Sequence, residues 1–147
     1  MSPLGAAEAA ALARARELAR NGRGRVSPNP LVGAVILRDG RLIAEGWHEG
    51  PGLAHAEVMA LRAAGTQARG ATLVCTLEPC SHFGRTPPCT TAVIEAGIAR
   101  VAVGCRDPLE RTRSSGVGLL REAGVEVVLA DGADERRSRE LIDAFIT

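Results

Sequence analysis

Aromatic residues are scarce in this chain, and lysine is absent. Phenylalanine, tryptophan and tyrosine together make up 2% of the 147 residues, and tyrosine does not occur. Proteins that hold single-stranded nucleic acid stack its bases on aromatic side chains. The composition therefore disfavours a platform of that kind. It favours a core of small and aliphatic side chains, which suits helices packed on a sheet.

An excess of charge of either sign is also missing. The chain has 18 basic residues, all of them arginine, against 17 acidic ones, and its net charge is +1. This balance argues against a nucleic-acid or membrane surface, where basic residues gather. Arg14, Arg16 and Arg20 lie along a predicted helix that also carries Glu8 and Glu17. We expect these charges to form a solvated face.

Long hydrophobic runs are absent as well. No segment approaches the roughly 18 apolar residues that a membrane-spanning helix needs. Glu8, Arg14 and Arg16 interrupt the alanine-rich N-terminus, which predicts a helix and not a signal peptide. We therefore expect a cytoplasmic protein with reduced cysteines, in which Cys75 and Cys105 are buried thiols of predicted strands.

The spacing of apolar residues predicts alternating helices and strands. Helices are expected at about residues 6–20, 54–64, 87–96, 117–123 and 133–145. Strands are expected at about 32–37, 42–44, 72–76, 101–104 and 125–129. Asp39-Gly40 predicts a two-residue turn that makes a hairpin of the first two strands. We expect one domain over residues 1–147, an α/β fold of three α/β/α layers around a five-stranded mixed sheet.

Two short motifs contain one imidazole, two thiols and a carboxylate. His55 and Glu57 begin one predicted helix, Cys80 follows a predicted strand, and Cys89 begins another helix. Three protein ligands suit a catalytic zinc ion, which keeps its fourth position for water and lowers that water's pKa to about 7. Nitrogen and sulfur donors favour zinc over magnesium or calcium. The sequence therefore predicts that His55, Cys80 and Cys89 bind zinc while Glu57 moves protons.

Each of these residues also has a plainer interpretation. Cys80 and Cys89 could form a disulfide or a redox pair. Glu57 could simply place a favourable charge at a helix N-terminus. Glu78, in the same motif as Cys80, is expected to support the loop.

The motifs together resemble one family. His-x-Glu followed by Pro-Cys is the pattern of zinc deaminases. The long loop from Ser81 to Pro88 resembles the deaminase half of the bifunctional riboflavin-biosynthesis deaminase/reductase, which is the diaminohydroxyphosphoribosylaminopyrimidine deaminase family. Residues 27–35, 45–48 and 70–73 match the pattern of that family in order and spacing, and the likeness runs from about Leu12 to Phe145. It implies a cytidine deaminase-like fold.

The resemblance also implies a reaction and its partners. The expected activity is hydrolytic deamination of 2,5-diamino-6-ribosylamino-4(3H)-pyrimidinone 5′-phosphate to 5-amino-6-ribosylaminouracil 5′-phosphate, with Glu57 as acid and base. The positions that surround this substrate in the family are Asn29, His48, His82, Arg85 and Asp107. We expect this phosphorylated pyrimidine as substrate, no nucleic-acid or membrane partner, a homo-oligomer, and possible cooperation with a separate reductase.

Two of these substrate positions have alternative interpretations. Arg85 could fork onto the phosphate, or it could make a loop salt bridge. Asn29 could read the edge of the heterocycle, or it could cap a turn.

Two departures from the family keep other functions open. Residues 109–115 replace the usual Asn-Pro and short segment after Asp107-Pro108, and the chain stops near the point where the family continues into its reductase domain. We therefore expect either a stand-alone deaminase or an isolated domain. The alternatives are a deaminase of a related aminopyrimidine or nucleoside in a specialised pathway, a nucleobase or tRNA deaminase, and an inactive zinc-bound partner module. Retention of Glu57 argues against the inactive module.

Overall fold

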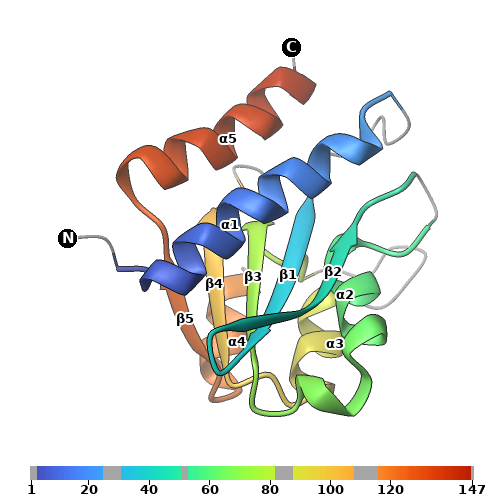
Figure 1. The fold of residues 1–147 in the computed structure, drawn as a ribbon, viewed down its shortest axis with the longest axis vertical. Coiled ribbons are helices and arrows are strands. Elements are labelled where there is room, and N and C mark those ends of the chain that lie inside the picture. Colours follow the sequence, from blue (N-terminus) through green and yellow to red (C-terminus); the bar gives the residue numbers. More distant parts are fainter. Residues whose placement is uncertain (1–2, 25–30, 51–52, 82–87, 108–115, 147) are drawn as a thin grey trace.

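The computed structural model describes residues 3–24, 31–50, 53–81, 88–107 and 116–146. Its centre is one five-stranded sheet in the order β2-β1-β3-β4-β5 (Figure 1). β1 pairs antiparallel with β2 and with β3, whereas β3, β4 and β5 run parallel. The strands are β1 (Gly33–Arg38), β2 (Arg41–Trp47), β3 (Thr72–Leu77), β4 (Arg100–Cys105) and β5 (Glu126–Leu129). The predicted five-stranded mixed sheet is confirmed.

Helices cover both faces of this sheet. α1 and α5 lie on one face, and α2, α3 and α4 lie on the other (Figure 1). Their bounds are α1 (Ala6–Ala19), α2 (Ala56–Ala64), α3 (Cys89–Glu95), α4 (Gly116–Glu122) and α5 (Gly132–Ile146), with short 3₁₀ turns η1 (Arg20–Gly22) and η2 (Gly65–Ala68). The three predicted layers are present, and the predicted helix ends agree to within about two residues, the usual uncertainty at helix ends. β2 is longer than predicted and continues to Trp47, three residues past the expected end at Ala44.

Alternation along the strands divides the core between the two faces. In β3, Leu73 and Cys75 pack against the α2–α4 side, while Val74 packs against α1. Successive side chains of a strand point to opposite faces, so a strand covered on both sides is apolar throughout. Cys75 and Cys105 are buried thiols that form no disulfide, as the sequence predicted.

The hairpin between β1 and β2 forms at the predicted turn. Asp39 and Gly40 both have positive φ angles, 53° and 76°. Such angles match the turns that follow the right-handed twist of paired strands. This turn places β2 at the edge of the sheet, where α2 packs on it.

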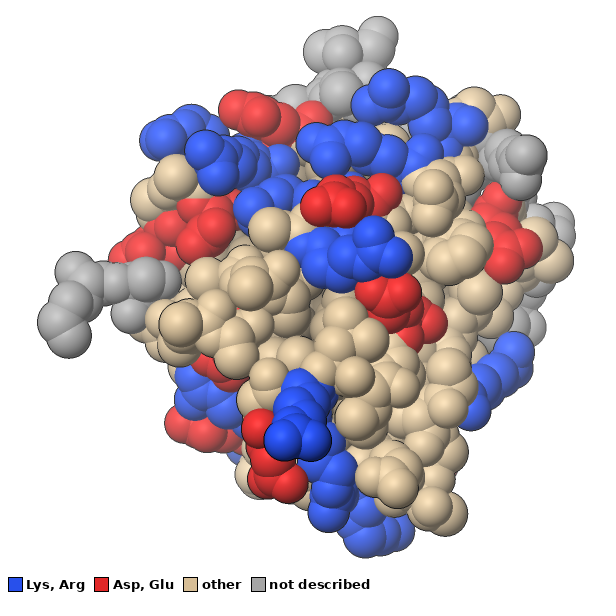
Figure 2. Space-filling model, viewed as in Figure 1, with Lys and Arg blue, Asp and Glu red and all other residues tan. Residues whose placement is uncertain are grey.

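The expectation of a solvated charged face on α1 is wrong for Glu8 and Arg16, which are both buried. Glu8 is covered where it binds Arg100 of β4. The Arg16 side chain is only 7% exposed, and its guanidinium lies 3.7 Å from the carboxylate of Asp134. The cause is tertiary, because α5 packs beside α1 and covers this position (Figure 1). Arg14 and Arg20 are exposed, as expected. On the face seen in Figure 2, basic and acidic side chains lie next to one another.

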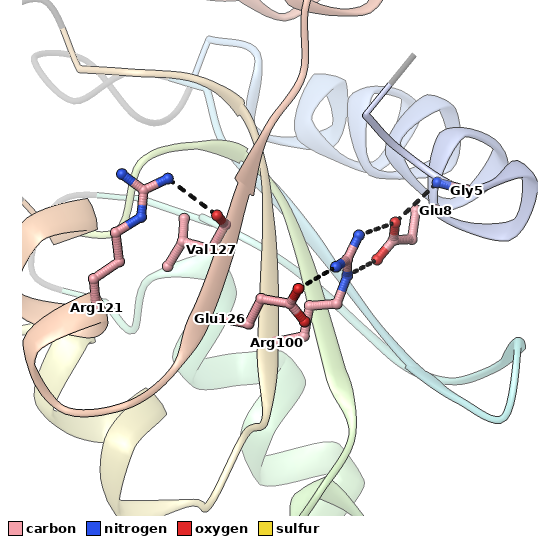
Figure 3. Close-up of polar contacts among 6 residues, drawn as sticks. All are labelled: Gly5, Glu8, Arg100, Arg121, Glu126 and Val127. Carbon is pink, nitrogen blue, oxygen red and sulfur yellow. Dashed lines mark hydrogen bonds and ion pairs between the residues drawn. The ribbon is translucent and has the colours of Figure 1, made fainter. Parts of the chain in front are cut away.

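A cluster of charged side chains links α1 to the sheet. The guanidinium of Arg100 on β4 donates to both carboxylate oxygens of Glu8, at 2.6 and 2.9 Å, and pairs with Glu126 of β5 at 3.0 Å (Figure 3). Glu8 also accepts the backbone N–H of Gly5, which begins the helix. The Arg100 hydrogen bond holds the pKa of Glu8 below its usual value. This cluster therefore stabilises the α1 contact most when Glu8 is ionised.

Within the described residues, no helix has both the length and the apolar character needed to cross a bilayer.

Candidate active site

The three predicted zinc ligands meet at one point of the fold. Cys80 follows the carboxyl end of β3, Cys89 is the first residue of α3, and His55 is the N-cap of α2. Their donor atoms all lie within 4.8 Å of one another. In open α/β sheets, bound molecules usually lie beyond the carboxyl ends of the strands. The fold thus brings together a nitrogen and two sulfurs that are far apart in the sequence.

The spacing of these donors suits zinc. His55 Nδ1 lies 3.1 Å from Cys89 Sγ and 3.7 Å from Cys80 Sγ. Tetrahedral zinc with bonds of about 2.3 Å to sulfur and 2.0–2.1 Å to nitrogen would separate its donors by about 3.5–3.8 Å. The observed separations need little adjustment to reach that range. Three protein donors also leave a fourth position open.

Hydrogen bonding between the two thiols favours the thiolate form of Cys80. The bond from Cys89 lowers the pKa of Cys80 to about 4, and the backbone N–H of Cys89 also donates to this sulfur, at 3.1 Å. The same thiol–thiol bond, together with burial, raises the pKa of Cys89. A thiolate is the form of cysteine that binds a metal. Both cysteines are free, so no disulfide competes for them.

Glu57 is a buried carboxyl beside the three donors. It lies in the first turn of α2 and is 4% exposed. Burial raises its pKa to about 7, while bonds from its own backbone N–H and from the Cys89 thiol act in the opposite direction. A carboxylate that served only to place a favourable charge at a helix N-terminus would normally be exposed to solvent. The observed burial next to the donor cluster fits a group that exchanges protons with a bound molecule.

Two of the predicted substrate residues are described by the structure. His48 is buried, donates from Nδ1 to the carbonyl of Ala54 at 3.2 Å, and packs edge-on against His55. Burial lowers the pKa of His48. Asp107 follows β4 and is half-buried, at the same edge of the sheet as Cys80. The other three predicted contacts, Asn29, His82 and Arg85, lie outside the described residues, as does the altered segment after Pro108.

Two residues that position the site were not singled out from the sequence. A Cβ on Gly46 would meet the backbone of α2, at the carbonyl of Ala56 and 2.7 Å from the nitrogen of Ala60, so this glycine lets β2 approach the helix that carries Glu57. The buried hydroxyl of Thr76 accepts the backbone N–H of Gly33 at 3.2 Å and joins β3 to the start of β1. A glycine inside a strand often marks such a close approach, which was the available signal.

Comparison with known proteins decides the family. Residues 7–105 match the model of the cytidine and deoxycytidylate deaminase zinc-binding region. The chain belongs to this family. The matched region contains the three donors and Glu57, and the predicted cytidine deaminase-like fold is confirmed.

Within the family, the chain belongs with the diaminohydroxyphosphoribosylaminopyrimidine deaminases. It is 45% identical over 116 residues to the deaminase of that name from Buchnera aphidicola subsp. Schizaphis graminum, with 79% of each protein covered. It is 51% identical over 133 residues to the riboflavin biosynthesis protein RibD of Aquifex aeolicus, which covers 90% of this chain and 37% of the relative. The resemblance stated from the motifs is therefore confirmed.

A solved structure agrees with the sequence comparison. The chain is similar to RibD of Acinetobacter baumannii with a TM-score of 0.87 and 44% identity. The match covers 95% of this chain and 39% of that protein. The chain thus spans only about a third of the length of the RibD proteins it matches.

Proposed function

We propose that this protein is a zinc-dependent aminopyrimidine deaminase of riboflavin biosynthesis. The observation that carries the proposal is the meeting of His55, Cys80 and Cys89 beside the buried carboxyl of Glu57. Zinc bound by these three residues would supply Lewis-acid chemistry and lower the pKa of a water molecule to about 7. The relatives named above support the choice of pathway.

The reaction assigns a specific task to Glu57. Hydrolytic deamination forms a bond from the water oxygen to the ring carbon that carries the amino group, and the carbon–nitrogen bond then breaks. Glu57 would take the two protons of the water in turn, returning one to the ring nitrogen and one to the leaving amine. Ammonia departs and a carbonyl remains. A positioned acid and base of this kind contributes typically about 10²–10⁴-fold to the rate.

We propose 2,5-diamino-6-ribosylamino-4(3H)-pyrimidinone 5′-phosphate as the substrate. The printed name of the Buchnera relative supports this choice, since it describes a diaminohydroxyphosphoribosylamino-pyrimidine deaminase. His48 packs against His55, and Asp107 follows β4 at the sheet edge where Cys80 follows β3. Both are proposed to contact the substrate, together with Asn29, His82 and Arg85. Arg85 is proposed to bind the phosphate through charge-assisted hydrogen bonds.

A related aminopyrimidine is the second candidate substrate. The specific observation behind it is Leu109, which stands where the resembled family has an asparagine at the substrate. Arg111, Arg113 or Ser115 could replace that amide. If none of them does, a different ring or sugar would be preferred.

Three further features are proposals of the same kind. We propose that residues 1–147 act as a single deaminase domain, since all five strands join one sheet. A separate reductase would then act on the product. A homo-oligomer and a cytoplasmic location remain predictions.

The test is a substrate panel for the purified, zinc-loaded protein. Ammonia release is measured with the proposed phosphate, its dephosphorylated analogue, cytidine, deoxycytidylate and a short RNA. We expect the ribosylaminopyrimidine phosphate to have the highest kcat/KM. A preference for the dephosphorylated compound or for another pyrimidine would remove the riboflavin assignment and favour the second candidate. Absence of ammonia release from every compound would contradict the deaminase proposal itself.

A further inference from the structure

We propose that Glu78 is a positioning residue of the active site. Its buried carboxylate would set the place of Asp107 and of the start of α4 relative to Cys80, without touching the substrate. The inference deepens the proposed function and rests on it, because Asp107 matters only if it contacts a bound pyrimidine. The evidence is a set of contacts that join three separate segments.

Glu78 connects these segments with both of its oxygens. Oε1 accepts the backbone N–H of Asp107 at 3.1 Å, and Oε2 accepts the backbone N–H of Val117 at 2.8 Å. The side chain is fully buried, with 0% exposure. Its charged partner is Arg106, whose Nε lies 3.6 Å from Oε1 but whose side chain is 52% exposed. The backbone amides are therefore the close partners of the carboxylate.

The backbone around Glu78 also makes close contacts, with the end of β4 and with the start of α4. The N–H of Glu78 donates to the carbonyl of Cys105 at 2.9 Å, which continues the pairing of β3 with β4. On the other side, a Cβ at Gly116 would meet the carbonyl oxygen of Pro79 and lie 3.3 Å from Cγ of Glu78. The segment that leads into Cys80 is thus enclosed between the end of β4 and the first turn of α4.

These contacts explain how a carboxyl group can be buried here. Taking a carboxylate out of water is costly unless hydrogen bonds replace its hydration. Here two backbone N–H groups donate to the two oxygens of one carboxylate. An amide side chain in the same place could accept only one of these N–H groups, because its NH₂ group would face the other and two donors would meet. The arrangement therefore fits a carboxylate and not the corresponding amide.

Glu78 is connected to the active site by its place in the chain and by its contact with Asp107. It lies two residues before Cys80, and the amide of Asp107 sits directly on its carboxylate. Displacing Asp107 should weaken substrate binding, whereas Cys80 also has its own contact with the backbone of Cys89. We therefore expect that loss of the Glu78 carboxylate changes KM more than kcat, and that it changes zinc binding least.

Steady-state kinetics of Glu78→Gln test this expectation, with Arg106→Gln as the matched control. For the ribosylaminopyrimidine phosphate, KM should rise about 10–150-fold, which corresponds to the loss of one hydrogen bond to a charged group. The kcat should stay within about threefold and zinc should remain at one per chain, the pattern of lost binding. Arg106→Gln removes only the exposed partner and should behave as wild type. An unchanged KM with a lowered kcat would mean a purely structural role and overturn the proposal.

A measurement that needs no activity separates this inference from the proposed function. In wild type, the backbone amides of Asp107 and Val117 should be protected from hydrogen exchange, and in Glu78→Gln both should exchange at least about tenfold faster. Equal exchange rates in the two proteins would overturn the inference, even if the wild type releases no ammonia from any compound. Should Glu78→Gln not fold, Glu78→Asp keeps the charge on a shorter side chain and should raise KM in the same direction. A wild-type KM in that variant would equally overturn the proposal.

Discussion

The ring of His48 packs edge-on against the ring of His55, with centroids 5.1 Å apart and planes at 90°. His48 is further held by its Nδ1–H, which donates to the carbonyl of Ala54, the residue before His55. The ring of the predicted zinc ligand thus packs on a second ring, which is itself hydrogen-bonded to the residue before that ligand. Groups that orient a metal ligand typically change metal affinity by about 10–100-fold when they are removed.

Two variants can separate these contributions of His48. His48→Asn keeps a donor for the Ala54 carbonyl but removes the ring, and we expect zinc affinity to fall about tenfold. His48→Phe keeps the ring contact and should stay within about threefold of wild type. Competition with a chromogenic chelator measures both affinities. Equal affinities in His48→Asn and wild type would show that the ring contact does not orient His55.

Loss of any one predicted ligand should abolish tight zinc binding. The described residues contain one cluster of suitable donors, with three members, so no fourth protein donor compensates there. Metal analysis should find one zinc per chain in wild type and none in His55→Ala, Cys80→Ala or Cys89→Ala. Cys105→Ala is the matched control, because this thiol is also buried but bonds to the carbonyl of Thr76. Retention of zinc in all three ligand variants would contradict the site.

Local signals account for what the sequence predicted well. Asp39-Gly40 needs only its own positive φ angles to make the hairpin, and the three donors were found because their motifs have a characteristic order. The burial of Arg16 could not be predicted, because it depends on α5 packing beside α1. The hydrogen-bond partners of Glu78 are 29 and 39 residues away in the chain, and no local sequence pattern predicts them. Contacts set by tertiary packing are the part that the sequence alone does not reveal.

Enlarging Gly46 should disturb both the fold and the site. A Cβ there would meet the backbone of α2, and backbone gives way less easily than a flexible side chain. Gly46→Ala should therefore lower the free energy of unfolding by about 1–3 kcal/mol, the range for overpacked cores. Urea titration measures the loss. Gly5→Ala is the control, because its Cβ would lie 3.8 Å from Glu8 Oε1, an ordinary contact. Since Gly5 is the N-cap of α1, this variant should lose only the capping preference, at most about 1 kcal/mol. An unchanged urea midpoint in Gly46→Ala would mean that α2 can move away freely.

The bond between Glu8 and Arg100 should make stability depend on acid pH. The folded state lowers the pKa of Glu8, so its contribution is complete above the unfolded value of 4.5 and is lost as the pH falls through the lower folded value. Glu8→Gln should cost about 1–2 kcal/mol at pH 7, less than a fully buried charged hydrogen bond because Arg100 is partly exposed. The difference from wild type in urea titrations should shrink in strong acid. A constant difference at every pH would mean that packing, and not charge, supplies the effect.

The last prediction concerns the proton transfer assigned to Glu57. Glu57→Gln keeps the size of the side chain but cannot take up or return a proton, so kcat should fall by at least about 10²–10⁴-fold. Zinc content and the far-ultraviolet circular dichroism spectrum should match wild type, since the three donors come from other positions. Glu78→Gln is a useful comparison, because the same chemical change is expected there to alter KM and to leave kcat nearly intact. Wild-type turnover in Glu57→Gln would assign the carboxyl a structural role and leave the deamination without its acid and base.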